Sequence, residues 1–284
     1  MSRWLGCHVS IAGGFDQAVQ RAVALGCTAM QIFTKNASQW QASPIEPTAA
    51  EHFGRVWRES GLGPVIAHDS YLINLASPKP AVWEKSIAAL VDELQRCAIL
   101  GIDSLVMHPG AHVGSGEQAG LERVRQALTE VLAQAPPEVC LLIENTAGQG
   151  SCLGADFAHL ACLLDGFDSQ RLGVCFDTCH AHAAGYDLST PAGYAATMAA
   201  LETQIDLERI RAFHVNDCLR AVGSRVDRHT HIGQGTIGRA GFACLLQDGR
   251  FADRPMLLET PKGDADEMDR ANLELLRELA AGAD

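Results

Sequence analysis

The sequence has few lysines, few aromatic residues and no long apolar run. Its 284 residues contain four lysines, at positions 35, 79, 85 and 262, and aromatic residues make up 6% of the chain. No apolar run approaches the roughly 18 residues that a membrane-spanning helix needs. The N-terminal segment also lacks the apolar stretch of a signal peptide. We therefore expect a cytoplasmic protein that has no membrane association.

Two common sequence motifs are also missing. The ten cysteines form no C-x-x-C pair, which argues against a zinc ribbon or a thioredoxin-like redox motif. Several of them, such as Cys140 and Cys175, lie in apolar strings where a free thiol behaves as a small hydrophobic group, so we expect all ten to be reduced and mostly structural. The glycine turn at 12–14 lacks the G-x-G-x-x-G pattern of a dinucleotide-binding fold.

The overall composition is that of a globular, acidic protein. Hydrophobic residues make up 47% of the chain and charged residues 20%, which excludes a disordered or coiled-coil protein. The formal net charge is −12. This charge argues against nucleic-acid binding by bulk electrostatics, unless cations are bound among the acidic residues.

Short apolar segments alternate with longer helical patterns along the whole chain. Because the apolar segments do not alternate with polar residues, they resemble parallel strands that are buried on both faces. Eight units of strand and helix would average about 36 residues, the size expected in a (β/α)8 barrel. We therefore predict an α/β fold, a single-domain TIM barrel over residues 1–284, rather than an open doubly wound sheet. The predicted strands are 4–9, 28–33, 64–67, 103–107, 139–143, 172–176, 210–213 and 256–258, and the predicted helices are 13–25, 48–60, 79–100, 117–135, 155–165, 190–206, 239–247 and 265–281.

Six successive strands are each followed by a histidine or a carboxylate. The carboxyl ends of the strands of such a barrel converge on one mouth, where active sites are built. A cluster of carboxylates there is unfavourable unless a proton or a cation relieves it. These residues, spaced 33 to 45 positions apart, are His68, His108, Glu144, Asp177, His214 and Glu259.

Three further donors join this set. His180 follows one turn after Asp177, and Asp227 and His229 have the D-x-H spacing of an extended segment, although His231 could replace His229. Nine donors fit two or three metal ions better than one, and their mixture of imidazole and carboxylate suits Zn²⁺, with Mn²⁺ or Fe²⁺ as substitutes. Of the other histidines, His52 and His159 are expected on helix surfaces, and His112 and His182 lie near the mouth without a clear role.

These residues stand in motifs that resemble the endonuclease IV family of apurinic/apyrimidinic endonucleases. The resemblance covers nearly the whole chain, in the same order throughout. One departure is Ser38, where the family often has an arginine that inserts into DNA. The matching segments are GCHVS at 6–10, FTKN at 33–36, HDSYLIN at 68–74, HPG at 108–110, IENTAGQG at 143–150, GVCFDTCH at 173–180, AGYD at 184–187, HVND at 214–217, GSRVDRH at 223–229 and LETP at 258–261.

The resemblance implies a barrel with three zinc ions at its mouth. One zinc would be held by His68, His108 and Glu144, which would bridge to a second zinc. The second would also be held by Asp177, His214 and Glu259, and the third by His180, Asp227 and His229. The family hydrolyses the phosphodiester 5′ to an abasic site in duplex DNA and leaves a 3′-hydroxyl and a 5′-deoxyribose phosphate. This chain would then be a phosphodiester hydrolase of the deoxyribonuclease IV type, acting as a monomer.

Expected roles follow from this resemblance. Water activated by the metal ions would attack phosphorus in line, and Glu144 would be the catalytic residue that both bridges the metals and orients that water. Tyr71 and Leu72 are candidates for wedges that penetrate the duplex. Lys35, Arg225 and Arg228 are candidates for phosphate contacts.

Two other functions remain possible from the residues themselves. One is a metal-dependent sugar isomerase on a related barrel, which would need a lysine or histidine acting on the sugar, and no lysine lies at a predicted strand end. The other is a lesion-binding protein without turnover, which the complete set of nine donors argues against.

Overall fold

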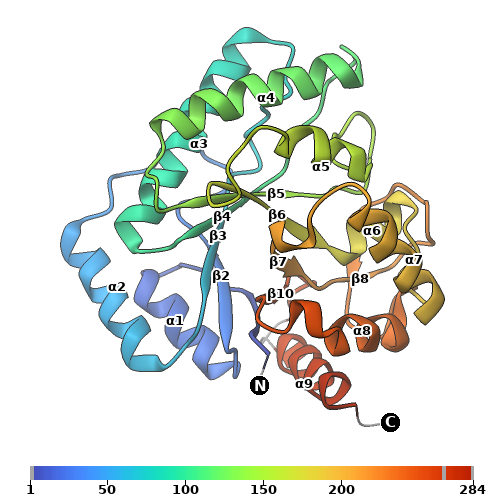
Figure 1. Ribbon diagram of the computed structural model, residues 1–284. Helices are drawn as coiled ribbons and strands as arrows, with labels where there is room; N and C mark the ends of the chain where they lie inside the picture. The colour runs from blue at the N-terminus through green and yellow to red at the C-terminus, as the bar shows by residue number, and fades with distance from the viewer. Residues whose placement is uncertain (1–2, 264–266, 283–284) are drawn as a thin grey trace.

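The computed structural model describes residues 3–263 and 267–282, and its centre is a closed barrel of parallel strands (Figure 1). Each strand pairs with the next one along the chain, and β10 closes the ring against β1. The fold confirms the predicted TIM barrel. Its strands are β1 (Leu5–His8), β2 (Ala29–Phe33), β3 (Val65–His68), β4 (Ser104–Met107), β5 (Cys140–Glu144), β6 (Leu172–Asp177), β7 (Ile210–His214) and β10 (Met256–Leu258).

The helices lie around the outside of this barrel (Figure 1). Two of them, α2 and α3, begin with a proline at the first turn and end at Gly61 and Gly101, whose φ of 71° is the left-handed conformation that favours glycine. None of the helices in the described residues is long and apolar enough to cross a membrane. Their bounds are α1 (Phe15–Ala24), α2 (Pro47–Ser60), α3 (Pro80–Leu100), α4 (Glu117–Gln134), α5 (Phe157–Leu164), α6 (Thr178–Ala184), α7 (Pro191–Glu202), α8 (Gly238–Gln247) and α9 (Glu267–Ala281).

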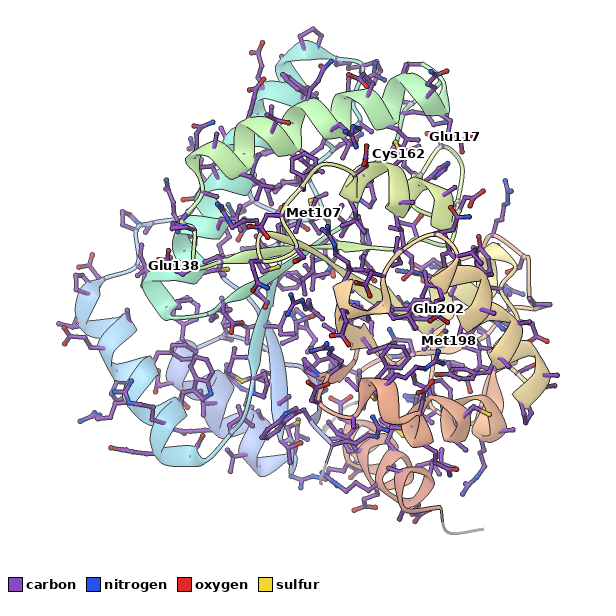
Figure 2. All side chains as sticks on the ribbon, viewed as in Figure 1. Met107, Glu117, Glu138, Cys162, Met198 and Glu202 are labelled. Carbon is purple, nitrogen blue, oxygen red and sulfur yellow. The ribbon has the colours of Figure 1, made fainter. Side chains whose placement is uncertain are left out.

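The core has two layers. The larger layer fills the space between strands and helices and includes Met107 of β4 and Met198 of α7, both labelled in Figure 2. The smaller layer fills the inside of the barrel, where Gly6 of β1 packs so closely that an added Cβ would lie 1.8 Å from the carbonyl oxygen of Ala29. The interior residues of the other seven strands are Ala29, Ile66, Val106, Leu142, Cys175, Ala212 and Leu257.

The interior layer explains where the polar residues lie. Side chains on a strand alternate between its two faces, so the residue two positions after an interior residue also points into the barrel. That position brings a polar side chain to the carboxyl end of the barrel in all eight strands. The eight residues are His8, Gln31, His68, His108, Glu144, Asp177, His214 and Glu259.

Some short elements were not predicted. Helix α6 starts directly after β6, where the side chain of Asp177 caps it by accepting a hydrogen bond from the backbone N–H of His180 at 2.7 Å. The antiparallel pair β8 (Asp217–Cys218) and β9 (His229–Thr230) and the single turns η1 (Leu207–Arg209) and η2 (Gly249–Phe251) are too short to give a sequence period. Helix α9 begins at Glu267, and the predicted start at 265 lies outside the described residues.

Candidate metal centre

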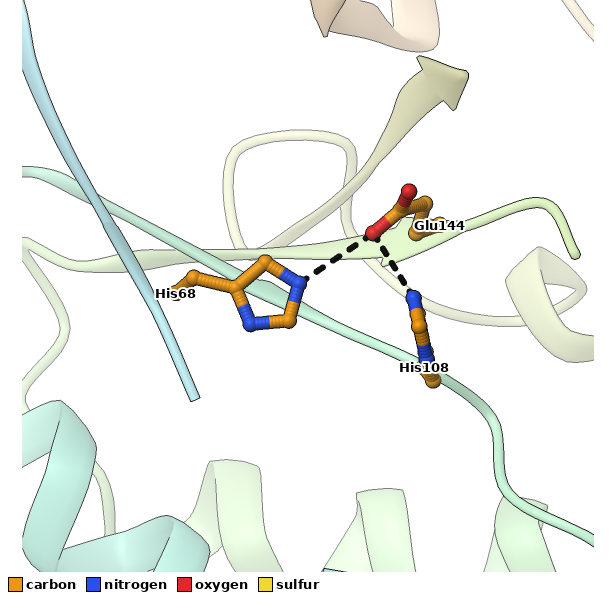
Figure 3. Close-up of side chains that lie close together, drawn as sticks. All are labelled: His68, His108 and Glu144. Atoms are coloured by element: carbon orange, nitrogen blue, oxygen red, sulfur yellow. Dashed lines mark hydrogen bonds and ion pairs between the residues drawn. The ribbon is translucent and has the colours of Figure 1, made fainter. Parts of the chain in front are cut away.

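The first donor group joins strands β3, β4 and β5. The imidazoles of His68 and His108 both point at the same carboxylate oxygen of Glu144, with Nε2–Oε2 distances of 3.2 and 3.0 Å (Figure 3). His68 and Glu144 are buried, whereas the side chain of His108 is 39% exposed. One side of this group is therefore open to a ligand.

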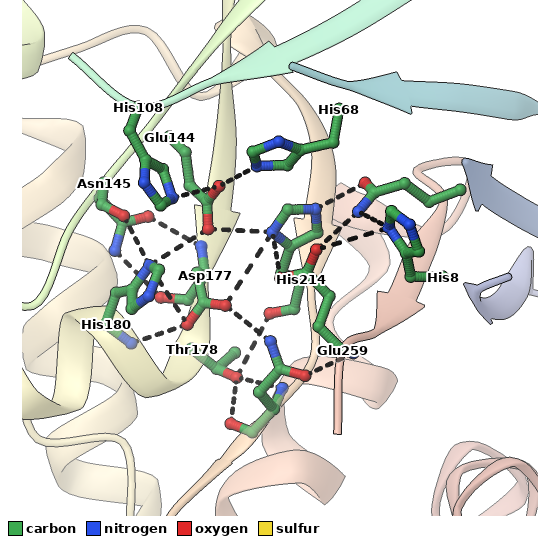
Figure 4. A network of polar contacts seen from close by, with 12 residues as sticks. His8, His68, His108, Glu144, Asn145, Asp177, Thr178, His180, His214 and Glu259 are labelled. Atoms are coloured by element: carbon green, nitrogen blue, oxygen red, sulfur yellow. Dashed lines mark hydrogen bonds and ion pairs between the residues drawn. The ribbon is translucent and has the colours of Figure 1, made fainter. Parts of the chain in front are cut away.

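The second group shares Glu144 with the first. Nδ1 of His214 lies 2.9 Å from Oε1 of Glu144 and 3.3 Å from Oε2 of Glu259. Asp177 completes the group, with its Oδ2 4.0 Å from the same nitrogen. The two oxygens of Glu144 thus face different donor groups, which is the arrangement of a bridging carboxylate (Figure 4).

The third group comes from helix α6 and the hairpin of β8 and β9. Asp227 lies between two imidazoles, 3.3 Å from Nε2 of His180 and 3.2 Å from Nε2 of His229. Cys179 was not predicted as a donor, but its thiol lies within 4.8 Å of the donor atoms of Asp177 and His229. His231 belongs to none of the groups found among the described residues; its Nδ1 lies 3.2 Å from the side-chain amide of Asn272.

Backbone carbonyls orient three of the histidines. Nδ1 of His68, His180 and His229 lies 3.0, 2.9 and 3.2 Å from the carbonyl oxygens of Asp69, Asn145 and Glu259. A carbonyl only accepts hydrogen bonds, so each Nδ1 carries a proton and the neutral ring presents a lone pair at Nε2. Each of these lone pairs faces a carboxylate oxygen, which is unfavourable unless a cation or a proton lies between them.

One atom of the third group has no hydrogen-bond partner at all. Nε2 of His229 is buried and forms no hydrogen bond within the described residues, although Oδ1 of Asp227 lies 3.2 Å away. A buried nitrogen of this kind needs an explanation, and a bound ion is one of those that native structures provide. The orientation of the rings and this unpartnered nitrogen both fit a set of divalent cations held by imidazole and carboxylate.

Gln31 is a supporting residue that the sequence analysis missed. It is fully buried, its Oε1 lies 2.7 Å from Nε2 of His214, and its Nε2 donates to Oε1 of Glu259 at 2.6 Å. The same Nε2 lies 3.0 Å from Nδ1 of His8. Gln31 therefore turns Nδ1 of His214 toward the carboxylates. Its position two residues after the interior Ala29 was the signal that could have identified it.

Two asparagines hold Asp177 and Glu259 of the second group in place. Asn145 accepts a hydrogen bond from the backbone N–H of Asp177 at 2.8 Å. Asn216 donates to Oδ2 of Asp177 at 2.7 Å and accepts from the backbone N–H of Glu259 at 2.7 Å. Asn145 directly follows Glu144 in the sequence, and Asn216 lies two positions after His214. The sequence analysis did not identify either asparagine as a supporting residue.

Ion pairing between imidazoles and carboxylates shifts the pKa values of the donors. Burial raises the pKa of Glu144, but the charges of His214 and His108 outweigh it and hold that pKa well below its usual range. Burial also raises the pKa of Glu259, but the charge of His214 outweighs it and lowers this pKa to about 2. Burial lowers the pKa of His229, but Asp177 and Asp227 raise it to about 9. Positive charge is therefore strongly favoured among these carboxylates.

A cavity of about 300 Å³ opens over the three groups. Its volume is at the lower end of the range for ligand pockets. Lys262, in the segment after β10, also lines this cavity, and its Nζ pairs with Asp269 at 2.5 Å. The sequence analysis did not predict that Lys262 lies at the site. The lining residues are His8, His68, Tyr71, His108, His180, Asp227, His229, Glu259, Thr260 and Lys262.

Four of the five predicted DNA-contacting residues lie at accessible positions. Tyr71 lines the cavity, is 71% exposed, and packs edge-on against Phe33 with ring centroids 5.5 Å apart. Leu72 beside it is partly exposed, and Arg225 and Arg228 are exposed on the segment that leads to β9. Arg225 adopts the left-handed conformation, with φ of 54°, and lines a neighbouring groove with His112.

Two other placements differ from the prediction. The side chain of Lys35 is 1% exposed, because its Nζ pairs with Asp92 at 2.9 Å and with Glu93 at 3.3 Å on helix α3. Lys35 is thus not available to a phosphate, and its role is to anchor the segment after β2. His159 is buried rather than on the surface; its Nδ1 accepts from the backbone N–H of Gly154, and its Nε2 lies 3.0 Å from Glu117.

Comparison with known proteins places this fold in a defined class. Residues 19–279 match the family described as xylose isomerase-like TIM barrel. The fold is shared with a D-tagatose 3-epimerase-like protein, whose crystal structure covers 97% of each chain with a TM-score of 0.75 and 19% identity. At that identity the similarity shows the fold alone.

More similar relatives identify the branch of this class. The chain is 51% identical over 281 residues to the probable endonuclease 4 of Chloroflexus aurantiacus, covering 98% of this chain and 99% of the relative. It is 50% identical to that of Trichlorobacter lovleyi, covering 98% and 100%. The crystal structure of endonuclease IV from Thermus thermophilus matches with a TM-score of 0.88 and 40% identity over 99% of this chain and 100% of that one. This chain therefore belongs to the endonuclease IV family.

Proposed function

We propose that this protein is a metal-dependent DNA-repair endonuclease that hydrolyses the phosphodiester 5′ to abasic sites in duplex DNA. The products would be a 3′-hydroxyl and a 5′-deoxyribose phosphate. The observation that carries the proposal is the convergence of nine donors on one mouth, with Glu144 shared between two of the groups. The names of the family relatives support an endonuclease, and the donor set supports three zinc ions, or Mn²⁺ as a substitute.

The residues of the site would have distinct roles in this reaction. Bound divalent cations would supply the Lewis acidity that activates water and offsets the charge of the phosphate. The two oxygens of Glu144 would hold the first and second groups in register and orient the attacking water. The carbonyl-bound histidines and Gln31 would keep the donors fixed, so that little reorganisation accompanies the reaction.

The mouth also provides a place for the substrate. Tyr71 stands over the cavity and would enter the duplex at the lesion, with Leu72 beside it, which helps to extrude a nucleotide that has no base to stack. Arg225 and Arg228 would contact phosphates. Because the chain is acidic overall, binding would depend on these local cations and on the metal centre rather than on bulk charge.

A duplex with a single tetrahydrofuran abasic analogue tests this function. We expect zinc-loaded protein to nick the labelled strand directly 5′ to the analogue, and a polymerase to extend the new 3′ end, which shows a free hydroxyl. The same duplex with a normal base is the control and should stay intact. Binding without nicking would instead support a lesion-binding protein, and turnover of free aldoses alone would support the isomerase that Lys262 in the cavity could serve.

Replacement of Tyr71 with alanine should weaken recognition of the lesion without damaging the metal centre. Loss of one stacked aromatic group in nucleic-acid binding costs on the order of 1–3 kcal/mol, or roughly 5- to 150-fold in affinity. We expect a weaker Kd for the abasic duplex and an unchanged metal content. Val23 on the surface of α1 is also exposed, at 46%, so Val23→Ala is the matched control. Equal Kd values for Tyr71→Ala and the control would contradict the proposed contact.

A further inference from the structure

The carboxylate of Asp217, at the start of β8, is fully buried and surrounded by backbone N–H groups. Oδ1 accepts from Cys218 at 2.8 Å and from Ile237 at 3.0 Å. Oδ2 accepts from Gly233 at 2.9 Å and from Gly235 at 3.0 Å. The N–H of Gly238, at the start of α8, reaches both oxygens at 3.3 and 3.4 Å. One side chain thus collects five backbone donors.

These five donors come from the two ends of a single loop. Cys218 lies at its beginning, and residues 233–238 lie at its end, so the carboxylate draws the two ends together. The loop between them contains β9, which pairs with β8 so that Cys218 stands opposite His229. A further hydrogen bond, from the N–H of Leu219 to the carbonyl of Arg228 at 2.9 Å, extends this pairing by one residue. Asp227 and His229 of the third donor group are therefore presented by a loop whose base is built around Asp217.

A glycine makes room for this carboxylate. A Cβ added to Gly235 would lie 2.4 Å from Oδ1 of Asp217 and 2.4 Å from the carbonyl oxygen of Cys218. The neighbouring Thr236 donates its hydroxyl to the carbonyl of Arg220 at 2.6 Å, which ties the end of the loop to its first residues. Within the part of the chain that the structure describes, Asp217 belongs to none of the donor groups that could hold a metal ion.

We propose that Asp217 is a positioning residue for the third metal site, because its carboxylate fixes the loop that presents Asp227 and His229. This inference rests on the proposed metal centre and deepens it. An anion held by converging backbone N–H groups is a strong and directional arrangement. The substitution Asp217→Asn keeps the shape of the side chain. In either orientation of the amide, however, its NH2 group faces at least two backbone donors, so hydrogen bonds are replaced by clashes between donors.

The test is metal content per chain, measured by elemental analysis after passage through metal-free buffer. We expect three zinc ions in the wild-type protein and two in Asp217→Asn, as in Asp227→Asn, which removes a donor directly. Loss of an outer-shell partner of a metal ligand typically weakens metal affinity roughly 10- to 100-fold. Added zinc should therefore restore the third ion and the cleavage activity of Asp217→Asn. The exposed Asp206, which accepts the N–H of Glu208 outside the mouth, provides the control Asp206→Asn, which should retain three ions.

The outcomes separate this inference from the proposed function. If the wild-type protein retains three ions and Asp217→Asn also retains three with the same affinity, the role of Asp217 is wrong while the metal centre stands. If the wild-type protein binds no metal, the metal centre itself is wrong and the inference with it. Should Asp217→Asn fail to fold, as judged by its thermal transition, Gly235→Ala is measured in its place and is expected to retain two ions.

Discussion

The variant Glu144→Gln is expected to lose cleavage of the abasic duplex by more than about a thousand-fold, the order of loss seen when a central catalytic group of a hydrolase is removed. Glutamine keeps the shape of the side chain but replaces one carboxylate oxygen with an NH2 group. Because Oε2 faces His68 and His108 while Oε1 faces His214, either orientation of the amide removes a ligand atom from one donor group.

The same substitution should also change the metal content. We expect elemental analysis to show loss of at least one of the ions shared by the first two groups, with the third group less affected. The matched control is Glu138→Gln, an exposed carboxylate just before the other end of the same strand β5, labelled in Figure 2. Near-normal turnover of Glu144→Gln with full metal content would contradict the bridging role, whereas the control should behave as the wild-type protein.

Removal of the metal ions should abolish cleavage and lesion binding and should lower thermal stability. Ions that bind the folded chain stabilise it by RT ln(1 + [L]/Kd), about 4 kcal/mol for one site at a thousand times its Kd. For a chain of this length we expect the Tm to fall on the order of 10 °C for each such site. Three Zn²⁺ would also bring the formal charge from −12 to −6, so the metal-free mouth should repel DNA.

The pH dependence of chelation has a defined direction. In the metal-free site the pKa of His229 is raised to about 9, so at neutral pH a metal ion must displace its proton. Metal affinity should therefore rise with pH until about 9, and chelation should be easier as the pH falls. Activity that survives exhaustive chelation, checked by elemental analysis, would contradict the proposal. Re-addition of Zn²⁺ or Mn²⁺ should restore cleavage, and Mg²⁺ should not, because it prefers oxygen ligands.

Six of the nine candidate donors could be predicted because strand period and barrel geometry act together, and the other three were predicted from their spacing. Each donor of β3 to β7 and β10 follows a short apolar run, and in a closed barrel those positions meet at one mouth. The orientation of the rings was not predictable. Nδ1 of His180 faces the carbonyl of Asn145, 35 positions earlier in the chain, and such a contact leaves no local pattern.

Lys35 and Lys262 show the limit of reasoning from residue type. Both are lysines in segments that follow a strand, and the resemblance favoured Lys35 for contact with DNA. Helix α3 places Asp92 and Glu93 against Lys35 and buries it, whereas Lys262 extends into the cavity. Both lysines pair with a carboxylate from a helix, but the side chain of Lys35 is 1% exposed and that of Lys262, paired with Asp269 of α9, is 41% exposed. This difference is set by packing rather than by local sequence.

The sequence alone predicted the barrel, the edge at which the site lies and nine candidate donors, six from the residue at each strand end and three from their spacing. The family resemblance implied the grouping of the donors, with Glu144 shared between two groups. The tertiary structure decided how the donors are held: it placed Gln31 behind His214 and Glu259, and gathered a loop around Asp217. The physical reason is that hydrogen-bond partners of buried groups come from distant parts of the chain, which only the closed fold brings together.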